Sequence, residues 1–271
     1  MTQWPESLIL VGAGKMGGAM ARGWLAGGLP AASLTLIDPQ PSEEIVTFAS
    51  SRKVAVNPAN PRSPAAIALA IKPQALEGAA AAIAPLVAEN TLVLSILAGK
   101  TIADLRSRLP RSRAVVRAMP NTPAAIGRGV SAAFASPETT PEQRQWCENL
   151  LRVVGGFHWV DSEGAIDAVT AISGSGPAYV FALTEAMAAA GERLGLSAEL
   201  AMSLARGTVE GAAELMHRDP ETTPETLRRH VTSPGGTTAA ALAVLQSPKG
   251  LEDLMVRACA AARDRAAELA G

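Results

Sequence analysis

The sequence predicts an α/β domain over residues 1–161, followed by an all-helical domain over residues 162–271. In the first half, short apolar runs alternate with helical stretches, a pattern typical of βαβ units in a mostly parallel sheet. The runs are predominantly apolar, as expected of strands covered by helices on both faces. After Asp161, helical patterns interrupted by Gly-Pro-Ser clusters replace the alternation. We therefore expect the domain boundary near Asp161.

The expected elements follow one another in the order that this fold class requires. The expected strands are Ser7–Val11, Leu34–Ile37, Ala66–Ile71, Thr91–Ile96 and Ala114–Ala118, with helices at Met16–Gly27 and Leu76–Val87. In the second half, helices are expected at Ile166–Ile172, Ala178–Leu194, Ala198–Met216, Thr223–His230, Thr238–Leu245 and Leu251–Leu269. Because only 3% of the residues are aromatic, small and aliphatic side chains must form the core.

The composition argues against several classes of protein. With 24 basic and 25 acidic residues, the chain lacks the basic surface that nucleic acid or a membrane attracts. Its two cysteines and three histidines are too few for a disulfide framework or an evident metal site. We find no targeting segment and no run that is apolar and long enough to span a bilayer. We expect a soluble, cytoplasmic protein without a bound metal.

A glycine motif directly follows the first expected strand. Gly12-Ala13-Gly14-Lys15-Met16-Gly17 fits the pattern G-x-G-x-x-G and opens a helix. In a dinucleotide site, the first glycine permits a tight turn and the second lets the backbone approach a pyrophosphate. The third lets the helix pack closely, with its positive end toward the phosphates. The strand–turn–helix context favours a cofactor site over an ordinary glycine-rich turn.

Three further segments lie where a cofactor would bind. Asp38 ends the second expected strand, where an acidic residue accepts hydrogen bonds from the adenosine ribose and disfavours a 2′-phosphate. It favours NADH over NADPH, although Asp-Pro pairs also start plain turns. Lys72 is placed to reach a cofactor phosphate or ribose, or is simply solvated. Asn121 and Thr122 follow a strand at the ligand-binding edge of the sheet, and an alternative is that they only form a rigid turn.

The loop Ser233-Pro234-Gly235-Gly236-Thr237-Thr238 precedes an alanine-rich helix in the second half. Successive backbone amides at a helix start can cradle an anion, and the two glycines let a ligand come close. Such a loop suits a small carboxylate. The alternative is an N-capped helix with a tight entry turn.

These residues resemble the pyrroline-5-carboxylate reductase family over nearly the whole chain. The segments that carry the resemblance are Val11–Gly17, Ala70–Pro73, Arg117–Pro123, Asp167–Tyr179 and Val231–Leu242. The resemblance implies a Rossmann-like N-terminal domain and a helical C-terminal dimerisation domain. It also implies a homodimer, which in many members assembles into a decamer. The implied reaction is the reduction of 1-pyrroline-5-carboxylate to L-proline with NADPH or NADH.

The resemblance also implies roles for individual residues. Thr238 is implied as the catalytic residue, hydrogen-bonded to the ring nitrogen of the substrate. The rest of the substrate site is implied to comprise Ser233, Gly235, Gly236 and Thr237, with Glu163 lining the pocket. The implied cofactor contacts, besides the glycine motif and Asp38, are Asn57, Ala70, Ile71, Lys72, Pro73, Asn121 and Thr122. Many members carry a phosphate-tolerant residue where Asp38 stands.

Two other functions compete with the reductase. A β-hydroxyacid dehydrogenase also joins a dinucleotide domain to a helical domain, but it needs a catalytic lysine on a helix of the second domain. From Asp161 on, the only lysine is Lys249, which lies in an expected turn. The second rival is a protein that binds NAD(P)H without turnover.

Overall fold

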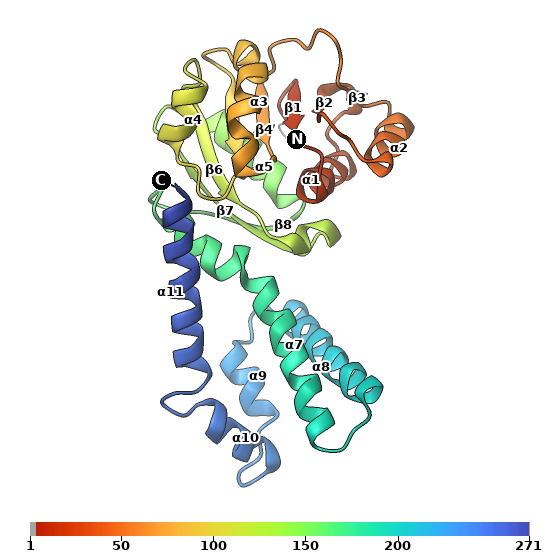
Figure 1. Cartoon of the computed structure of the whole chain (residues 1–271), viewed down its shortest axis with the longest axis vertical. Coiled ribbons are helices and arrows are strands. Elements are labelled where there is room, and N and C mark those ends of the chain that lie inside the picture. The colour runs from red at the N-terminus through yellow and green to blue at the C-terminus, as the bar shows by residue number, and fades with distance from the viewer. Residues whose placement is uncertain (1–3, 271) are drawn as a thin grey trace. The chain divides into compact units, whose positions relative to one another are not determined.

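The computed structural model of the chain describes residues 4–270 and divides into two compact units (Figure 1). Unit 1 comprises the chain up to Ser175 together with the residues from Ala262 onward, and unit 2 is Gly176–Ala261. The division falls after Ser175 rather than near Asp161. The reason is that helix α6 (Ala165–Val169) packs on two strands of the sheet of unit 1.

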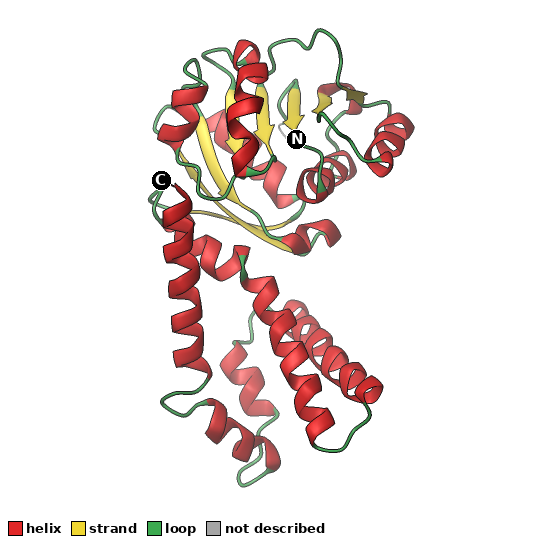
Figure 2. Ribbon diagram, in the orientation of Figure 1, coloured by secondary structure: helices red, strands yellow, loops and turns green. Residues whose placement is uncertain are grey.

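Unit 1 contains a sheet of eight strands, whose arrows are yellow in Figure 2. The order of the strands is β3-β2-β1-β4-β5-β6-β7-β8. Their bounds are β1 (Leu8–Val11), β2 (Leu34–Ile37), β3 (Ala55–Val56), β4 (Ala66–Leu69), β5 (Leu92–Ser95), β6 (Val115–Met119), β7 (Gly129–Ala135) and β8 (Gly155–Trp159). The first six strands are parallel and have the order of a doubly wound dinucleotide-binding sheet. β7 pairs antiparallel with β6, and β8 pairs parallel with β7.

The predicted strands are confirmed, and three strands were missed. β3 is only two residues long, which is too short for an apolar pattern. β7 and β8 begin with glycine and include polar residues such as Ser131 and His158, so neither reads as a buried apolar run. They extend the sheet beyond the six parallel strands.

Helices cover both faces of the sheet. Those of unit 1 are α1 (Lys15–Ala26), α2 (Glu43–Arg52), α3 (Leu76–Ile83), α4 (Ile102–Arg108), α5 (Pro141–Arg152) and α6, with short 3-10 helices η1 (Ala31–Ser33), η2 (Pro73–Ala75), η3 (Ala84–Leu86) and η4 (Thr122–Ile126). On one face of the sheet, every second strand residue packs with α1, α2 and α5 in the larger apolar cluster. On the other face, the strand residues in between pack with α3 and α4 in the smaller apolar cluster. Alternate residues of a strand point to opposite faces, so the uniformly apolar strands supply both clusters.

Helices α2, α4 and α5 were not predicted, although their first turns carry cap signals. Thr101 and Asp104 form a reciprocal capping box at α4, and Thr140 and Gln143 form another at α5. Ser42 caps α2 by accepting a hydrogen bond from the amide of Ile45. These S/T-x-x-D/Q patterns are readable from sequence and would have located the starts of α4 and α5.

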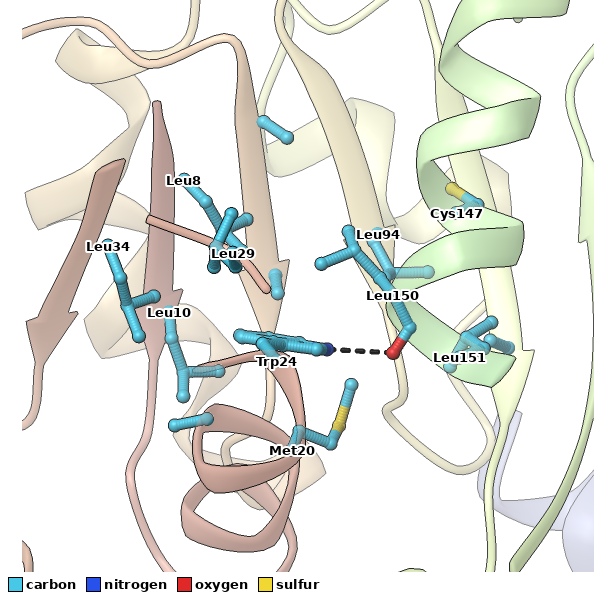
Figure 3. Close-up of a cluster of buried hydrophobic side chains, with 14 of the residues drawn as sticks. Leu8, Leu10, Met20, Trp24, Leu29, Leu34, Leu94, Cys147, Leu150 and Leu151 are labelled. Atoms are coloured by element: carbon cyan, nitrogen blue, oxygen red, sulfur yellow. Dashed lines mark hydrogen bonds between the residues drawn. The ribbon is translucent and has the colours of Figure 1, made fainter. Parts of the chain in front are cut away.

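Trp24 anchors α1 in the larger apolar cluster (Figure 3). Its ring is fully buried, and its indole Nε1 donates a 2.7 Å hydrogen bond to the carbonyl oxygen of Leu150 on α5. A buried tryptophan needs such a partner because its N–H would otherwise lose water without compensation. The bond therefore joins α1 and α5, which lie far apart in sequence.

Cys147 lies in the same cluster, and burial raises the pKa of its thiol above the usual range. Because only the thiolate is reactive, we expect Cys147 to resist a thiol reagent such as DTNB at pH 8 while the protein is folded. The half-buried Cys259 should react first. Mass spectrometry after timed labelling checks this order, and denaturant should make both thiols reactive. Fast labelling of Cys147 in the folded protein would contradict the packing of α5.

The regular secondary structure described in unit 2 is entirely helical. Its helices are α7 (Gly176–Arg193), α8 (Ala198–Arg218), α9 (Pro224–His230), α10 (Thr237–Leu245) and the part of α11 (Leu251–Ala270) that precedes Ala262. α7 and α8 pack against each other, and a Cβ on Gly191 would lie only 3.0 Å from the Cβ of Ala201. Small side chains therefore let these two helices approach closely. Large apolar side chains such as Phe181 and Leu194 remain exposed.

One helical stretch, residues 165–193, is long and apolar enough by length and composition to cross a membrane. No such run was expected from the sequence, and by length and composition this stretch contradicts that expectation. It contains the expected helices Ile166–Ile172 and Ala178–Leu194, with Ser173–Pro177 between them. A π-helical turn, η5 (Thr170–Gly174), carries the helix through this segment. Only 11% of the apolar window is buried within the chain. An exposed apolar helix face of this kind equally suits packing against another subunit.

Candidate active site

The glycine motif has the backbone geometry of a dinucleotide loop. Gly12 has φ +91°, and its amide donates a 2.8 Å hydrogen bond to the carbonyl of Ile37 at the end of β2. A Cβ on Gly17 would lie 2.0 Å from the carbonyl oxygen of Gly12, so the helix packs directly on the loop. A Cβ on Gly14 would meet nothing within 4 Å. The first and third glycines are therefore required by the fold, whereas the second leaves open space above the loop.

Helix α1 begins at Lys15, directly after that open space. Gly14 is its N-cap residue and provides no side chain to satisfy the first amides, and the first turn contains no acidic residue. Free amides and the helix dipole make such a helix start attractive to phosphate. The residues present thus fit a dinucleotide. Met16 is half-buried and packs on the larger apolar cluster, so its side chain belongs to the core.

Asp38 lies at the carboxyl end of β2 and is tied to the glycine loop. Its Oδ2 accepts a 2.7 Å hydrogen bond from the amide of Ala13, and its Oδ1 accepts one of 2.9 Å from the amide of Gln40. Two carboxylate oxygens offer about four acceptor sites, so capacity remains for ribose hydroxyls. The carboxylate therefore also holds the loop in place, a role that the sequence analysis did not identify.

A pocket of about 780 Å³ extends from the glycine loop to the start of α2. Besides Gly14, Lys15 and Asp38, it is lined by residues that the sequence analysis did not propose: Arg22, Gln40, Ser42 and Glu44. Gln40 and Ser42 follow Asp38 closely, so the end of β2 was the signal that could have indicated them. No sequence pattern around Arg22 indicates a cofactor contact, because only the fold brings its side chain from the second turn of α1 into the pocket.

Asn57 supports Asp38 rather than pointing into open space. Its side-chain Oδ1 accepts a 2.9 Å hydrogen bond from the amide of Asp38, and its Nδ2 donates one of 2.7 Å to the carbonyl of Asp38. Asn57 has φ +48°, a left-handed conformation that asparagine tolerates better than most residues. This two-point contact holds the end of β2. The implied contact of Asn57 with the cofactor stays a prediction.

Ala70–Pro73 follow β4, the strand next to β1 in the sheet. The amide of Ala70 donates a 2.8 Å hydrogen bond to the carbonyl of Val11. The carbonyl oxygen of Ala70 would lie 2.7 Å from a Cβ on Gly12, so this segment adjoins the glycine loop. Lys72 is exposed and Pro73 begins η2, while Ile71 is half-buried and packs on the smaller apolar cluster.

Asn121 is buried between η4, β7 and η5. Its Nδ2 donates a 3.1 Å hydrogen bond to the carbonyl of Ser173, and its Oδ1 accepts one of 2.9 Å from the amide of Val130. The structure therefore uses both ends of this amide to join three elements. Thr122 is exposed at the first position of η4 and remains available to a ligand.

Glu163 belongs to a charged cluster at the sheet. Its Oε1 accepts hydrogen bonds from the amide of Ile102 at 2.7 Å and from Nη1 of the buried Arg117 at 2.9 Å. Asp167 lies 3.9 Å from the other end of the same guanidinium. A buried guanidinium needs such partners. Glu163 thus fastens the segment before α6 to β6 and to the start of α4.

The loop before α10 lies in unit 2 and is largely exposed. Gly235 has φ +68°, and a Cβ on Gly236 would lie 2.6 Å from Oγ of Ser233. The amide of Gly236 donates a 3.1 Å hydrogen bond to the carbonyl of Ser233, which closes the turn. Gly236 is the N-cap of α10 and there is no side-chain cap, contrary to the alternative of a capped helix. The first amides of α10, from Thr237 onward, are thus not satisfied by a capping side chain.

Within the described part of the chain, no group of three or more His, Cys, Asp and Glu residues is placed to hold a metal ion.

Two family models match different parts of the chain. Residues 163–269 match the family model for pyrroline-5-carboxylate reductase dimerisation, and residues 7–99 match the model for NADP oxidoreductase, coenzyme F420-dependent. The pyrroline-5-carboxylate reductase of Pseudomonas aeruginosa is 42% identical over 266 residues, which cover 97% of this chain and 96% of the relative. The chain belongs to the pyrroline-5-carboxylate reductase family.

Solved structures of the reductase family have the same fold along the whole chain. The Coxiella burnetii pyrroline-5-carboxylate reductase aligns with a TM-score of 0.88 at 32% identity, covering 98% of this chain and 99% of that one. The Plasmodium falciparum pyrroline carboxylate reductase, solved with NADP bound, aligns with a TM-score of 0.79 at 25% identity and 98% coverage of both chains. These full-length matches favour a reductase over a β-hydroxyacid dehydrogenase.

Proposed function

We propose that this chain reduces 1-pyrroline-5-carboxylate to L-proline with NAD(P)H as the hydride donor. The observation that carries the proposal is the 42% identity with a pyrroline-5-carboxylate reductase over nearly the full length of both chains. The uncapped starts of α1 and α10 support the proposal, because each offers backbone amides to an anionic group.

The cofactor is proposed to bind on unit 1. The amides after Gly14 and the dipole of α1 face the pyrophosphate, while the Asp38 carboxylate accepts hydrogen bonds from the adenosine ribose. Thr122 and Ala70–Pro73 are assigned to the rest of the cofactor. Asn121 and Asn57 are also proposed to contact the cofactor. In addition, their hydrogen bonds within the protein hold the neighbouring backbone.

The substrate is proposed to bind through the loop before α10. The amides of Gly236, Thr237 and Thr238 hold its carboxylate, with Ser233 and Gly235 shaping the turn around it. The hydroxyl of Thr238 donates a hydrogen bond to the ring nitrogen and orients the imine. Glu163 is proposed to act near this site through its fixed position on Arg117. Bound NAD(P)H supplies hydride to C5 of the imine, so the two ligands must touch in the working enzyme.

Steady-state oxidation of NADH and of NADPH at saturating 1-pyrroline-5-carboxylate tests the activity. We expect substrate-dependent oxidation of both, with the higher kcat/KM for NADH because Asp38 disfavours a 2′-phosphate. A preference for NADPH would leave the reductase standing and remove the inference from Asp38. No oxidation of either cofactor by folded protein would favour a binding protein without turnover.

We also propose a soluble, cytoplasmic homodimer formed through the helical half. The match to a dimerisation model over residues 163–269 and the exposed apolar side chains of α7 and α8 support this assembly. Assembly of dimers into a decamer is proposed only from the family resemblance. Light scattering coupled to size-exclusion chromatography distinguishes the monomer, the dimer and the decamer by mass.

A further inference from the structure

Arg22 occupies the part of the cofactor pocket that lies toward α2. Its Nη2 is 2.7 Å from Oε1 of Glu44, and its guanidinium carbon lies 4.4 Å from the ring centroid of Phe48. Glu44 and Phe48 are four residues apart on α2 and therefore share one face of that helix. The ring contacts one face of the guanidinium, and the carboxylate accepts one of its hydrogen bonds.

The charged residues that line the pocket balance one another. Lys15 and Arg22 are basic, whereas Asp38 and Glu44 are acidic. The 2′-phosphate is the only group that distinguishes NADPH from NADH, and a phosphate monoester carries a charge of about −1.5 to −2 at pH 7. A pocket of balanced charge has no net attraction for that group, and Glu44 repels it directly.

Arg22 is nevertheless well suited to bind a phosphate. A guanidinium presents paired N–H donors that match phosphate oxygens, and a ring stacked on one face keeps it in place without using those donors. In this chain, Nη2 of Arg22 donates a hydrogen bond to Oε1 of Glu44. The Glu44 side chain is 81% exposed, so the pair is screened by water and is readily exchanged for another anion.

We propose that Arg22 is a latent ligand for the 2′-phosphate of NADP(H), and that Glu44 sets the cofactor preference by occupying it. The proposal rests on the proposed function, because it assumes that the adenosine ribose lies beside Asp38. It assigns the discrimination to a pair of residues on α1 and α2, in addition to the carboxylate at the end of β2. Removing the charge of Glu44 frees Arg22 and leaves the pocket with a net positive charge.

Direct binding of NAD⁺ and of NADP⁺, measured by calorimetry without substrate, tests this proposal. We expect Glu44→Gln to raise the affinity for NADP⁺ about 3- to 10-fold, with little change for NAD⁺. Arg22→Gln should lower the affinity for NADP⁺ alone. In the Arg22→Gln background, Glu44→Gln should give a clearly smaller gain, because its effect acts through Arg22. The ratio of kcat/KM for NADPH to that for NADH should follow the same order.

Glu148→Gln is the matched control. Glu148 pairs with Arg152 at 2.7 Å, and Arg152 lies 5.6 Å from the ring centroid of Phe157, so the same kind of pair is changed outside the pocket. This variant should leave the affinities for both cofactors unchanged. Circular dichroism and Tm establish that each variant is folded.

The outcomes separate the proposal from the function on which it rests. If folded wild-type protein binds neither NAD⁺ nor NADP⁺, the proposed function fails. If both bind and Glu44→Gln shifts them equally or not at all, only the role of Glu44 is overturned. An equal gain from Glu44→Gln with and without Arg22 would show that Arg22 is not the phosphate ligand.

Discussion

Gly14→Ala is expected to weaken the binding of NAD(P)H by roughly 100-fold while the protein remains folded. A Cβ at this position meets nothing within 4 Å of the protein, so it has no clash in the fold. It occupies the open space into which a pyrophosphate must come close to the backbone. Losing a hydrogen bond to a charged group costs about 1.5–3 kcal/mol, which corresponds to an effect of roughly this order on affinity. Fluorescence titration with NADH measures the affinity.

The stability of the Gly14→Ala variant should change little, because Gly14 is exposed and has φ −67°. Alanine is a poorer N-cap than glycine, which costs at most about 1 kcal/mol in the free energy of unfolding. Gly78→Ala is the control. Gly78 is an exposed glycine of α3, where a Cβ also meets nothing within 4 Å, and it does not line the pocket. It should bind NADH as the wild type does.

Gly17→Ala tests the other function of the glycine motif, which is to let α1 pack closely on the loop, apart from its function in cofactor binding. A Cβ there would lie 2.0 Å from the carbonyl oxygen of Gly12, so the backbone of the loop must move. This variant should lose stability as well as cofactor binding, which a thermal unfolding scan detects. A Gly14→Ala variant that binds NADH normally would contradict the placement of the pyrophosphate above the loop.

Thr238→Ala is expected to lower kcat by about tenfold or more. Thr238 lies in the first turn of α10, directly after the exposed loop, and its hydroxyl is proposed to orient the ring nitrogen of the substrate. One well-placed hydrogen bond that strengthens in the transition state has an effect of at least this size. Steady-state kinetics with 1-pyrroline-5-carboxylate measure kcat and KM separately.

Two further variants make this result specific. Thr238→Ser keeps the hydroxyl and should recover most of the lost rate. Thr47→Ala removes an exposed threonine of α2 and should leave the kinetics unchanged. NADH binding should be normal in Thr238→Ala, since unit 2 is not assigned to the adenosine half of the cofactor. Unchanged kcat in Thr238→Ala would remove its catalytic role without affecting the cofactor site.

Much of unit 1 and all of the helices of unit 2 were predictable, because their signals are local. The strand β2 was predicted with its observed bounds, since four mostly apolar residues end at an Asp-Pro turn. The tight turn at Gly12 and the close helix contact at Gly17 were predictable, because both restrict the backbone locally. The loop before α10 was also predicted from its local glycines, although the sequence did not show that α10 lacks a side-chain cap.

The contacts between distant residues could not be predicted from these patterns. The hydrogen bond between Asp38 and Ala13 joins residues 25 apart, and that between Asn121 and Ser173 joins residues 52 apart. Both side chains were expected to face the cofactor, whereas the fold also uses them to hold backbone in place. Hydrophobic periodicity and turn residues reflect neighbours in the sequence. They do not indicate which strand ends lie next to each other in the folded sheet.

The sequence alone indicated the alternation of strands and helices in unit 1, the helices of unit 2, the glycine loop and the resemblance to the reductase family, because each shows in patterns of residues close together in the chain. Only the tertiary structure placed Arg22 against Glu44, 22 residues away, and Glu163 against the buried Arg117, 46 residues away. Those pairs form because the parallel sheet brings separate helix starts and strand ends to one edge. A charged side chain then pairs with whichever partner the fold places within reach, and burial makes that partner necessary where water is excluded.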